Sequence, residues 1–176
     1  MTNLSLLNHR ILFLSEPISP EIANDIITKL LLLDADDHHS QIDLYINSPG
    51  GSVLDALAII DTMHCIQAPV STICIGKASS MAAWILAAGD KGKRLAAPNA
   101  EILIHQAAST FAGQTSDIQI YTKRLIQLQE RLIDMLSKWT GQNKAKIKKD
   151  MEHEFFMDVY QAKEYGIIDN VLEIFK

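Results

Sequence analysis

Short apolar runs alternate with longer stretches of helical spacing along the chain. This alternation is typical of an α/β domain, and 176 residues is the length of one ordinary domain. Strands are predicted at residues 11–14, 42–47, 70–75, 94–97, 102–105 and 171–175. Helices are predicted from Pro20 to near Asp34 and at residues 53–66, 79–88, 116–139, 143–151 and 158–166. The pattern therefore predicts a single α/β domain.

The helix predicted at residues 116–139 is long for a domain of this size. Its apolar positions fall at helical spacing, and Gly141 supplies a C-terminal stop. At 1.5 Å per residue it measures roughly 36 Å, more than one layer of a compact domain requires. We therefore expect part of it to project and pack on another subunit. Ile120 and Tyr121 lie off its main apolar stripe and either face such a partner or lie on the surface.

Charge and cysteine content narrow the function classes. A net charge of -5 argues against nucleic acid as the main partner, and the basic residues 91–94 are interpreted as a solvated turn. Cys65 and Cys74 match no metal or redox spacing, so we expect two buried, reduced thiols. No secretory signal is visible, and no apolar run approaches the roughly 20 residues that a bilayer requires. The sequence thus predicts a soluble, cytoplasmic protein.

Two turns between a strand and a helix carry groups that could do chemistry. Residues 47–52 place adjacent glycines at a helix start, where bare amides suit an anion or an oxyanion. A tight turn is the simpler interpretation of these glycines. In the second turn, Ser79 could cap the following helix while Ser80 acts as a nucleophile. Capping alone also explains the serine pair.

His105 ends a strand of buried type, where it is either a polar terminus or a base. A serine and a histidine can form a nucleophile and base pair from distant positions because the fold brings them together. His38 and His39 lie in a polar loop, where a surface metal clamp is the alternative to plain solvation. We predict no metal site in this chain.

Several longer motifs are spread over residues 10–172. They are Tyr-Ile-Asn-Ser-Pro-Gly-Gly-Ser-Val at 45–53, Ala-Ser-Ser-Met at 78–81, Lys-Gly-Lys-Arg at 91–94, Ile-His-Gln at 104–106 and Ala-Lys-Glu-Tyr-Gly at 162–166. In order and spacing they resemble the motifs of the Clp protease proteolytic subunit family. The resemblance implies the α/β fold shared by these peptidases and the crotonases, with repeated strand-strand-helix units. One domain would span residues 1–176, with a head at about 1–105 and 150–176 and a projecting helix-strand handle at about 106–149.

The resemblance also implies a serine endopeptidase. Ser80 would be the nucleophile, and His105 the general base and later the general acid. The backbone N–H groups of Gly51 and Met81 would form the oxyanion hole. An extended substrate would pair with the strand of residues 106–114, through the positions Gln106, Phe111, Gly113 and Gln114.

The third triad residue departs from the family pattern. Relatives carry an aspartate where alignment through Phe156-Met157 and Gly166 gives Glu154. A glutamate can orient a histidine, but its extra methylene moves the carboxylate by roughly 1.5 Å. Glu154 is therefore the expected orienter, with Asp158 and Asp150 as fallbacks and a solvated Glu154 as the alternative. The substrate strand departs too, because residues 107–110 replace the usual proline and paired glycines.

The resemblance further implies an assembly. Two seven-membered rings would stack into a homo-oligomeric tetradecamer, with a paralogous sister subunit as a further partner. An AAA+ unfoldase would use ATP and feed unfolded polypeptides into the chamber, while this chain would need no cofactor. The alternative is a weakly active or non-catalytic ring subunit that requires the sister. A crotonase-type acyl-CoA-binding enzyme is a third alternative.

Overall fold

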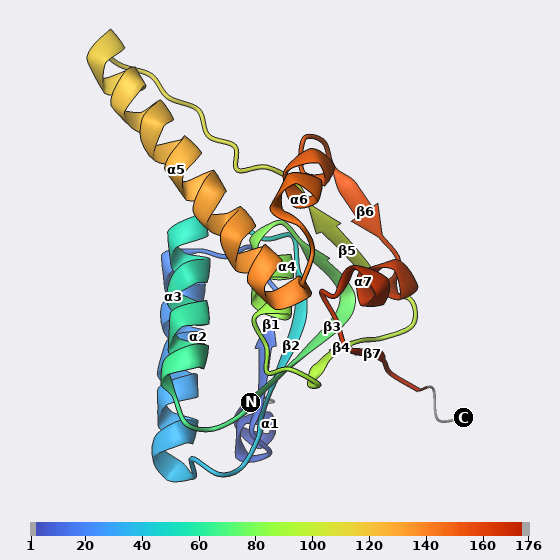
Figure 1. Ribbon diagram of the computed structural model, residues 1–176. Coiled ribbons are helices and arrows are strands. Elements are labelled where there is room, and N and C mark those ends of the chain that lie inside the picture. The colour runs from blue at the N-terminus through green and yellow to red at the C-terminus, as the bar shows by residue number, and fades with distance from the viewer. Residues whose placement is uncertain (1–2, 174–176) are drawn as a thin grey trace.

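A single mixed sheet forms the centre of the computed structural model, which describes residues 3–173 (Figure 1). Its strands are β1 (Ile11–Leu14), β2 (Ile42–Ser48), β3 (Val70–Ser79), β4 (Arg94–Ala96), β5 (Glu101–Ile104), β6 (Phe155–Met157) and β7 (Asn170–Val171). The helices are α1 (Asn3–Asn8), α2 (Pro20–Asp36), α3 (Val53–Cys65), α4 (Met81–Ala87), α5 (Thr115–Thr140), α6 (Lys144–Asp150) and α7 (Val159–Tyr165). The predicted α/β class is confirmed.

Strand β3 is the branch point of the sheet. Its first half pairs with β2 and β4, and its second half pairs with β5, all in parallel. β5 in turn pairs with β6, the antiparallel partner at this end of the sheet. Parallel strands place their carboxyl ends at the same edge of the sheet, so the ends of β3 and β5 lie close together.

Local sequence signals set the helix ends. The Ser19 side chain caps α2 by accepting a hydrogen bond from Ile22 N–H, and Pro20 is the first helical residue. Asp158 caps α7 in a capping box with Gln161. Gly141 ends α5 in the left-handed conformation that glycine adopts without strain, at φ 76°. The C-terminal stop predicted at Gly141 is confirmed.

The core lies between the sheet and its helices. Alternate residues of β2 are fully buried, and α2 and α3 pack against each other on one side. α4 is buried on every face, which explains why its sequence carries no charged residue. Burial raises the pKa of the Cys74 thiol to about 12, so this cysteine is an inert part of the core.

Several predicted details are wrong. β3 does not stop at Gly76 but continues to Ser79. The strand passes through Gly76 with a φ of 77°, which glycine tolerates because it has no side chain. Ser79 therefore belongs to β3 and does not cap α4. Cys65 is exposed rather than buried. The last predicted strand shrinks to β7, and residues 174 and 175 lie outside the described residues.

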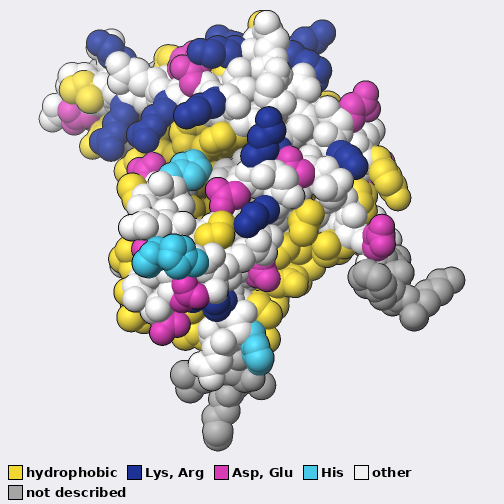
Figure 2. Space-filling view, turned by 60° about the horizontal axis from the view of Figure 1, so that its bottom comes forward, with side chains coloured by type: hydrophobic (Ala, Val, Ile, Leu, Met, Phe, Trp, Pro, Cys, Tyr) yellow, Lys and Arg dark blue, Asp and Glu magenta, His cyan; other side chains and the backbone are white. Residues whose placement is uncertain are grey.

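α5 extends beyond the body of the molecule, with the segment after β5 running alongside it (Figure 1). Basic side chains gather along the upper edge of the face in Figure 2, with acidic side chains among them. Three lysines of α6 form ion pairs: Lys144 with Asp134, Lys146 with Asp150 and Lys148 with Glu130. These pairs offset much of the positive charge of α6. None of the described helices is long and apolar enough to cross a membrane.

Candidate active site

Ser80 stands at the junction between β3 and α4 in a strained conformation. Its φ is 54° and its ψ is -133°, a region that residues other than glycine seldom occupy. Its N–H donates to Leu103 O at 2.9 Å, so the backbone is held against β5. The side chain does not cap α4 and forms no hydrogen bond with another described residue. The hydroxyl of Ser80 is therefore available for chemistry, and the strained turn projects it from the end of the sheet.

The glycine turn after β2 packs directly against this junction. A Cβ added to Gly50 would lie 2.5 Å from Ser79 O and 2.7 Å from Ser80 Cβ, so no larger residue fits. Ser48 Oγ accepts a hydrogen bond from Gly50 N–H at 3.1 Å and donates to Glu16 O. The turn is thus fixed by its own contacts, and it brings Gly51 beside the serine.

One cavity of about 230 Å³ brings four of the predicted site residues together. Ser80, His105, Gly51 and Met81 all line it. Within the described chain, the N–H groups of Gly51 and Met81 have no hydrogen-bond acceptor. Two unpaired amides beside a free hydroxyl form a place where a negatively charged oxygen would be stabilised.

His105 follows the last residue of β5 and is half-buried. Its Nδ1 lies 2.6 Å from Gln106 O. A carbonyl oxygen only accepts hydrogen bonds, so Nδ1 carries the proton and Nε2 is left bare. This tautomer is the one in which Nε2 can take a proton from a nucleophile. No pattern in the sequence indicated that a backbone carbonyl would orient this imidazole.

Glu154 lies near His105 but does not contact it through a hydrogen bond. The last pair of the β5–β6 ladder is Ile104 with Phe155, so His105 and Glu154 are each one residue beyond it. Glu154 is exposed, and no hydrogen bond joins it to any described residue. The ladder thus brings Glu154 to the correct end of the sheet, while its carboxylate faces solvent.

The two fallback carboxylates have other partners. Asp150 accepts hydrogen bonds from Lys146 Nζ at 2.6 Å and from Tyr165 Oη at 3.0 Å. Asp158 caps α7 and lies at the far end of β6 from Glu154. Both carboxylates hold helices in place, so neither is positioned to orient His105.

Apolar side chains also line this cavity. Val53, Trp84 and Leu132 contribute to it from α3, α4 and α5. Trp84 Nε1 donates to Leu132 O at 3.0 Å, a buried bond that joins the helix after Ser80 to the base of α5. The wall therefore offers an apolar surface to any group bound next to the hydroxyl.

The predicted substrate strand is not a strand in this structure. Residues 106–114 have no regular secondary structure. Gln106 lines the cavity, whereas Phe111 stacks on Tyr121 of α5 with ring centroids 5.4 Å apart. Gly113 has φ 149°, and Gln114 is the residue before α5. The segment follows the projecting helix, and its backbone lacks a neighbouring strand.

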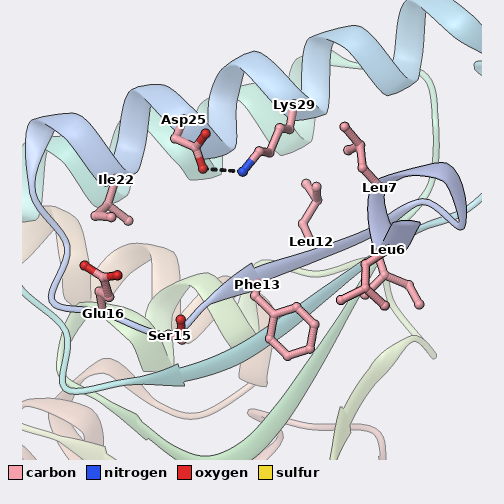
Figure 3. A pocket seen from close by; sticks show the side chains of 10 residues that line it. Leu6, Leu7, Leu12, Phe13, Ser15, Glu16, Ile22, Asp25 and Lys29 are labelled. Carbon is pink, nitrogen blue, oxygen red and sulfur yellow. Dashed lines mark hydrogen bonds and ion pairs between the residues drawn. The ribbon is translucent and has the colours of Figure 1, made fainter. Parts of the chain in front are cut away.

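A second cavity, of about 330 Å³, lies between α1, β1 and α2 (Figure 3). Apolar residues form most of its lining, and Asp25 and Lys29 form an ion pair at its edge. No histidine lines it, so it offers no nucleophile and base pair. The described residues also hold no cluster of three or more metal-ligating side chains. The ring centroids of His38 and His39 are 4.1 Å apart with the rings tilted by 51°, and no third metal-ligating side chain of the described residues joins them.

Fold and cavity together define an α/β protein whose central strand carries a strained, free serine beside a histidine and two unpaired amides. A family model described as Clp protease matches residues 2–174. An ATP-dependent Clp protease proteolytic subunit from Deinococcus radiodurans is 46% identical over 168 residues, which cover 96% of this chain and 82% of that protein. The chain belongs to the Clp protease family.

Proposed function

We propose that this chain is a Clp-type serine endopeptidase subunit in which Ser80 is the nucleophile. Membership in the Clp protease family makes it a peptidase of that system. The observation that supports the residue assignment is the single cavity lined by Ser80, His105, Gly51 and Met81. The family match favours this function over a crotonase-type acyl-CoA-binding enzyme, which would also use two backbone amides.

The proposed reaction is acyl transfer to Ser80 followed by hydrolysis. Ser80 Oγ attacks the scissile carbonyl carbon while His105 Nε2 accepts the hydroxyl proton. The carbonyl oxygen becomes an oxyanion and receives hydrogen bonds from the N–H groups of Gly51 and Met81. The C–N bond then breaks, and His105 returns its proton to the leaving amine. Water attacks the acyl-enzyme by the same route and releases the second peptide.

Glu154 is the proposed orienter of His105. Its place next to the ladder pair of Ile104 and Phe155 supports this role. A rotation of its side chain toward His105 would bring a carboxylate to Nδ1 in place of the Gln106 carbonyl. A carboxylate stabilises the imidazolium of the transition state more strongly than a neutral carbonyl does.

Substrate selection is proposed to depend on the peptide backbone. The segment 106–114 would pair with an extended chain by strand addition, which any sequence can satisfy. Such a site needs enclosure for selectivity, so we propose two stacked seven-membered rings around a closed chamber. The similar Deinococcus protein is named as an ATP-dependent subunit. By analogy, a partner AAA+ unfoldase would use ATP and deliver unfolded proteins, in the cytoplasm.

One observation favours a second candidate function. The carboxylate of Glu154 faces solvent rather than His105, so the triad is incomplete in the single chain. A subunit of this kind could serve as a weakly active ring component that a paralogous sister subunit completes. This candidate predicts rings that form normally but cleave peptide only after the sister is added.

The experiment is a peptidase assay on the purified full-length chain with two adjacent variants. Ser80→Ala should lower kcat for an unstructured peptide by roughly a thousandfold or more, because the nucleophile is lost. Ser79→Ala is the matched control, and its kcat should stay within about twofold of the wild type. Cleavage by Ser80→Ala at the wild-type rate would overturn the assignment. Intact rings without wild-type cleavage would support the second candidate.

A further inference from the structure

A side chain of the projecting helix holds the segment that follows His105. Gln129 Oε1 accepts a hydrogen bond from Ala107 N–H at 2.7 Å, in a partly buried position. The two residues are 22 positions apart, and Gln129 comes from the middle of α5. A backbone N–H can bond only to an acceptor, so chemistry requires that the amide oxygen of Gln129, not its nitrogen, faces Ala107.

This bond lies at the edge of the candidate active site. Ala107 and Ala108 line the cavity that also contains Ser80 and His105. The neighbouring residue, Gln106, is held from the other side by Met151 O, which accepts its N–H at 2.9 Å. The start of the segment is therefore attached on both sides, once to the head and once to α5.

Beyond Ala107 the attachments end. The N–H groups of residues 108–114 donate no hydrogen bond to any residue that the structure describes. No neighbouring strand fixes the register of this segment, in contrast to the ladder that fixes β5. The Gln129 bond is thus the last polar contact that sets the path of the segment as it leaves the cavity.

We propose that Gln129 is a positioning residue that aligns the backbone of residues 107 and 108 for an extended peptide. This inference rests on the proposed function of the cavity. Gln129 touches neither the reacting atoms nor the peptide, and it acts through Ala107. Without the bond, the half-buried Ala107 N–H loses its acceptor and turns to find another. The edge that receives the peptide then shifts relative to Ser80, so peptide binding weakens more than the chemical step.

The test is a double-mutant cycle between Gln129 and Ala107 in the full-length chain. Gln129→Ala should raise KM for an unstructured peptide roughly three- to tenfold, the loss expected for one hydrogen bond, with kcat within about twofold. Gln129→Glu keeps an oxygen acceptor and should retain the wild-type KM. Ala107→Pro removes the donor, so adding Gln129→Ala to it should change nothing further. The inference would be overturned if Gln129→Ala raised KM equally in the wild type and in Ala107→Pro. It would also be overturned if Gln129→Ala and Gln129→Glu changed KM equally.

A measurement that needs no activity separates this inference from the proposed function. Amide hydrogen exchange at Ala107 is followed in a Ser80→Ala background, which keeps the contact and removes catalysis. Adding Gln129→Ala should accelerate exchange at Ala107 by about tenfold while amides of α4 exchange as before. Unchanged exchange at Ala107 would end the proposal even if the wild type cleaves peptide. Accelerated exchange in a chain that cleaves nothing would leave the contact established and refute only the function.

Discussion

The two ends of α5 belong to the same helix but have opposite surroundings. At the C-terminal end, Leu132 and Leu136 are at most 2% exposed and pack in the core. At the N-terminal end, Ile120 is 63% exposed and Ile126 is 58% exposed. An apolar groove lines the exposed half, with Ile118 and Ile126 among its residues. Isolated exposed apolar residues are common, but Ile118 and Ile126 lie on one groove, as expected if a partner in the proposed rings covers this part of α5.

Polar contacts show the same contrast. Arg94 is buried and reaches the C-terminal end of α5 through Trp139 O at 3.1 Å. The same guanidinium donates to Gly166 O at 2.8 Å and to Asp169. One side chain at the start of β4 thus joins the C-terminal end of α5 to the end of α7 and to the residue before β7. In the N-terminal half of α5, residues 115–127, no side chain forms a hydrogen bond or ion pair with a described residue of the head, so the head stabilises only the C-terminal end of the helix.

The largest expected effect is on the buried ion pair. Asp169→Asn should lower the free energy of unfolding by about 3 kcal/mol at pH 7, because Arg94 would keep its charge in a buried position without a counter-charge. Urea denaturation measures the change. The matched control is Asp25→Asn, which breaks an exposed ion pair with Lys29 and should cost at most about 0.5 kcal/mol. Equal costs for the two variants would contradict the contrast between the anchored and exposed regions.

The same pair predicts a pH dependence. Burial raises the pKa of Asp169, but hydrogen bonds from the Arg94 side chain and backbone, together with the guanidinium charge, outweigh burial and leave the pKa below its ordinary value. A lowered folded-state pKa stabilises the protein above the unfolded value of about 3.9, and this stabilisation disappears as the pH falls through the folded value. The difference between wild type and Asp169→Asn should therefore shrink below about pH 4. If the stability difference between the wild type and Asp169→Asn grew as the pH fell, the pKa of Asp169 would be raised in the folded state rather than lowered.

The next effect concerns the group that orients His105, which is either the Glu154 carboxylate or the Gln106 carbonyl. If Glu154 has its proposed role, Glu154→Gln should lower kcat by about ten- to a hundredfold, because the carboxylate is lost while the Gln106 carbonyl still holds the tautomer. In Ser-His-Asp triads, a substitution that also leaves the histidine in the wrong tautomer lowers kcat by about 10⁴-fold. The measurement is kcat for the peptide, with Glu152→Gln as the control on an exposed neighbour. A Glu154→Gln variant as active as the wild type would leave the carbonyl as the only orienting group.

The smallest effect on stability is expected at the exposed end of α5. Ile126→Glu should change the free energy of unfolding of the chain by no more than about 0.5 kcal/mol, since the side chain packs on little of its own subunit. The same change should disrupt assembly, because it places a charge on an apolar contact surface. Sedimentation velocity reports the assembly, and Thr28→Glu adds the same charge to an exposed position of α2 as a control. Unchanged assembly of Ile126→Glu would show that no partner covers this surface.

Much of the fold could be predicted because its signals are local. The α5 bounds, Thr115–Thr140, differ little from the predicted 116–139, since the apolar spacing and Gly141 are both in the sequence. The starts of α2 and α7 could also be located, since Ser19 and Asp158 are residue types that favour an N-cap. The glycine turn at residues 47–52, Ser80 and His105 were also identified as candidates, because their residue types suit an oxyanion site, a nucleophile and a base.

The remaining features depend on contacts between distant segments. β6 was missed because three residues carry too little periodicity, and its pairing with β5 exists only in the fold. The position of Ser80 at the helix start, rather than Ser79, depends on a strand that continues through Gly76. The orientation of His105 by a carbonyl and the contact between Ala107 and Gln129 leave no pattern in the sequence.

Labelling with a small fluorophosphonate, followed by mass spectrometry of the modified peptide, tests the central claim most directly. The reagent reacts with a serine only when a base and an oxyanion site activate its hydroxyl. We predict one label per chain, on Ser80, which disappears in Ser80→Ala and slows strongly in His105→Ala. A chain that takes up no label, or takes it up on Ser79 or another hydroxyl, would contradict the proposed site.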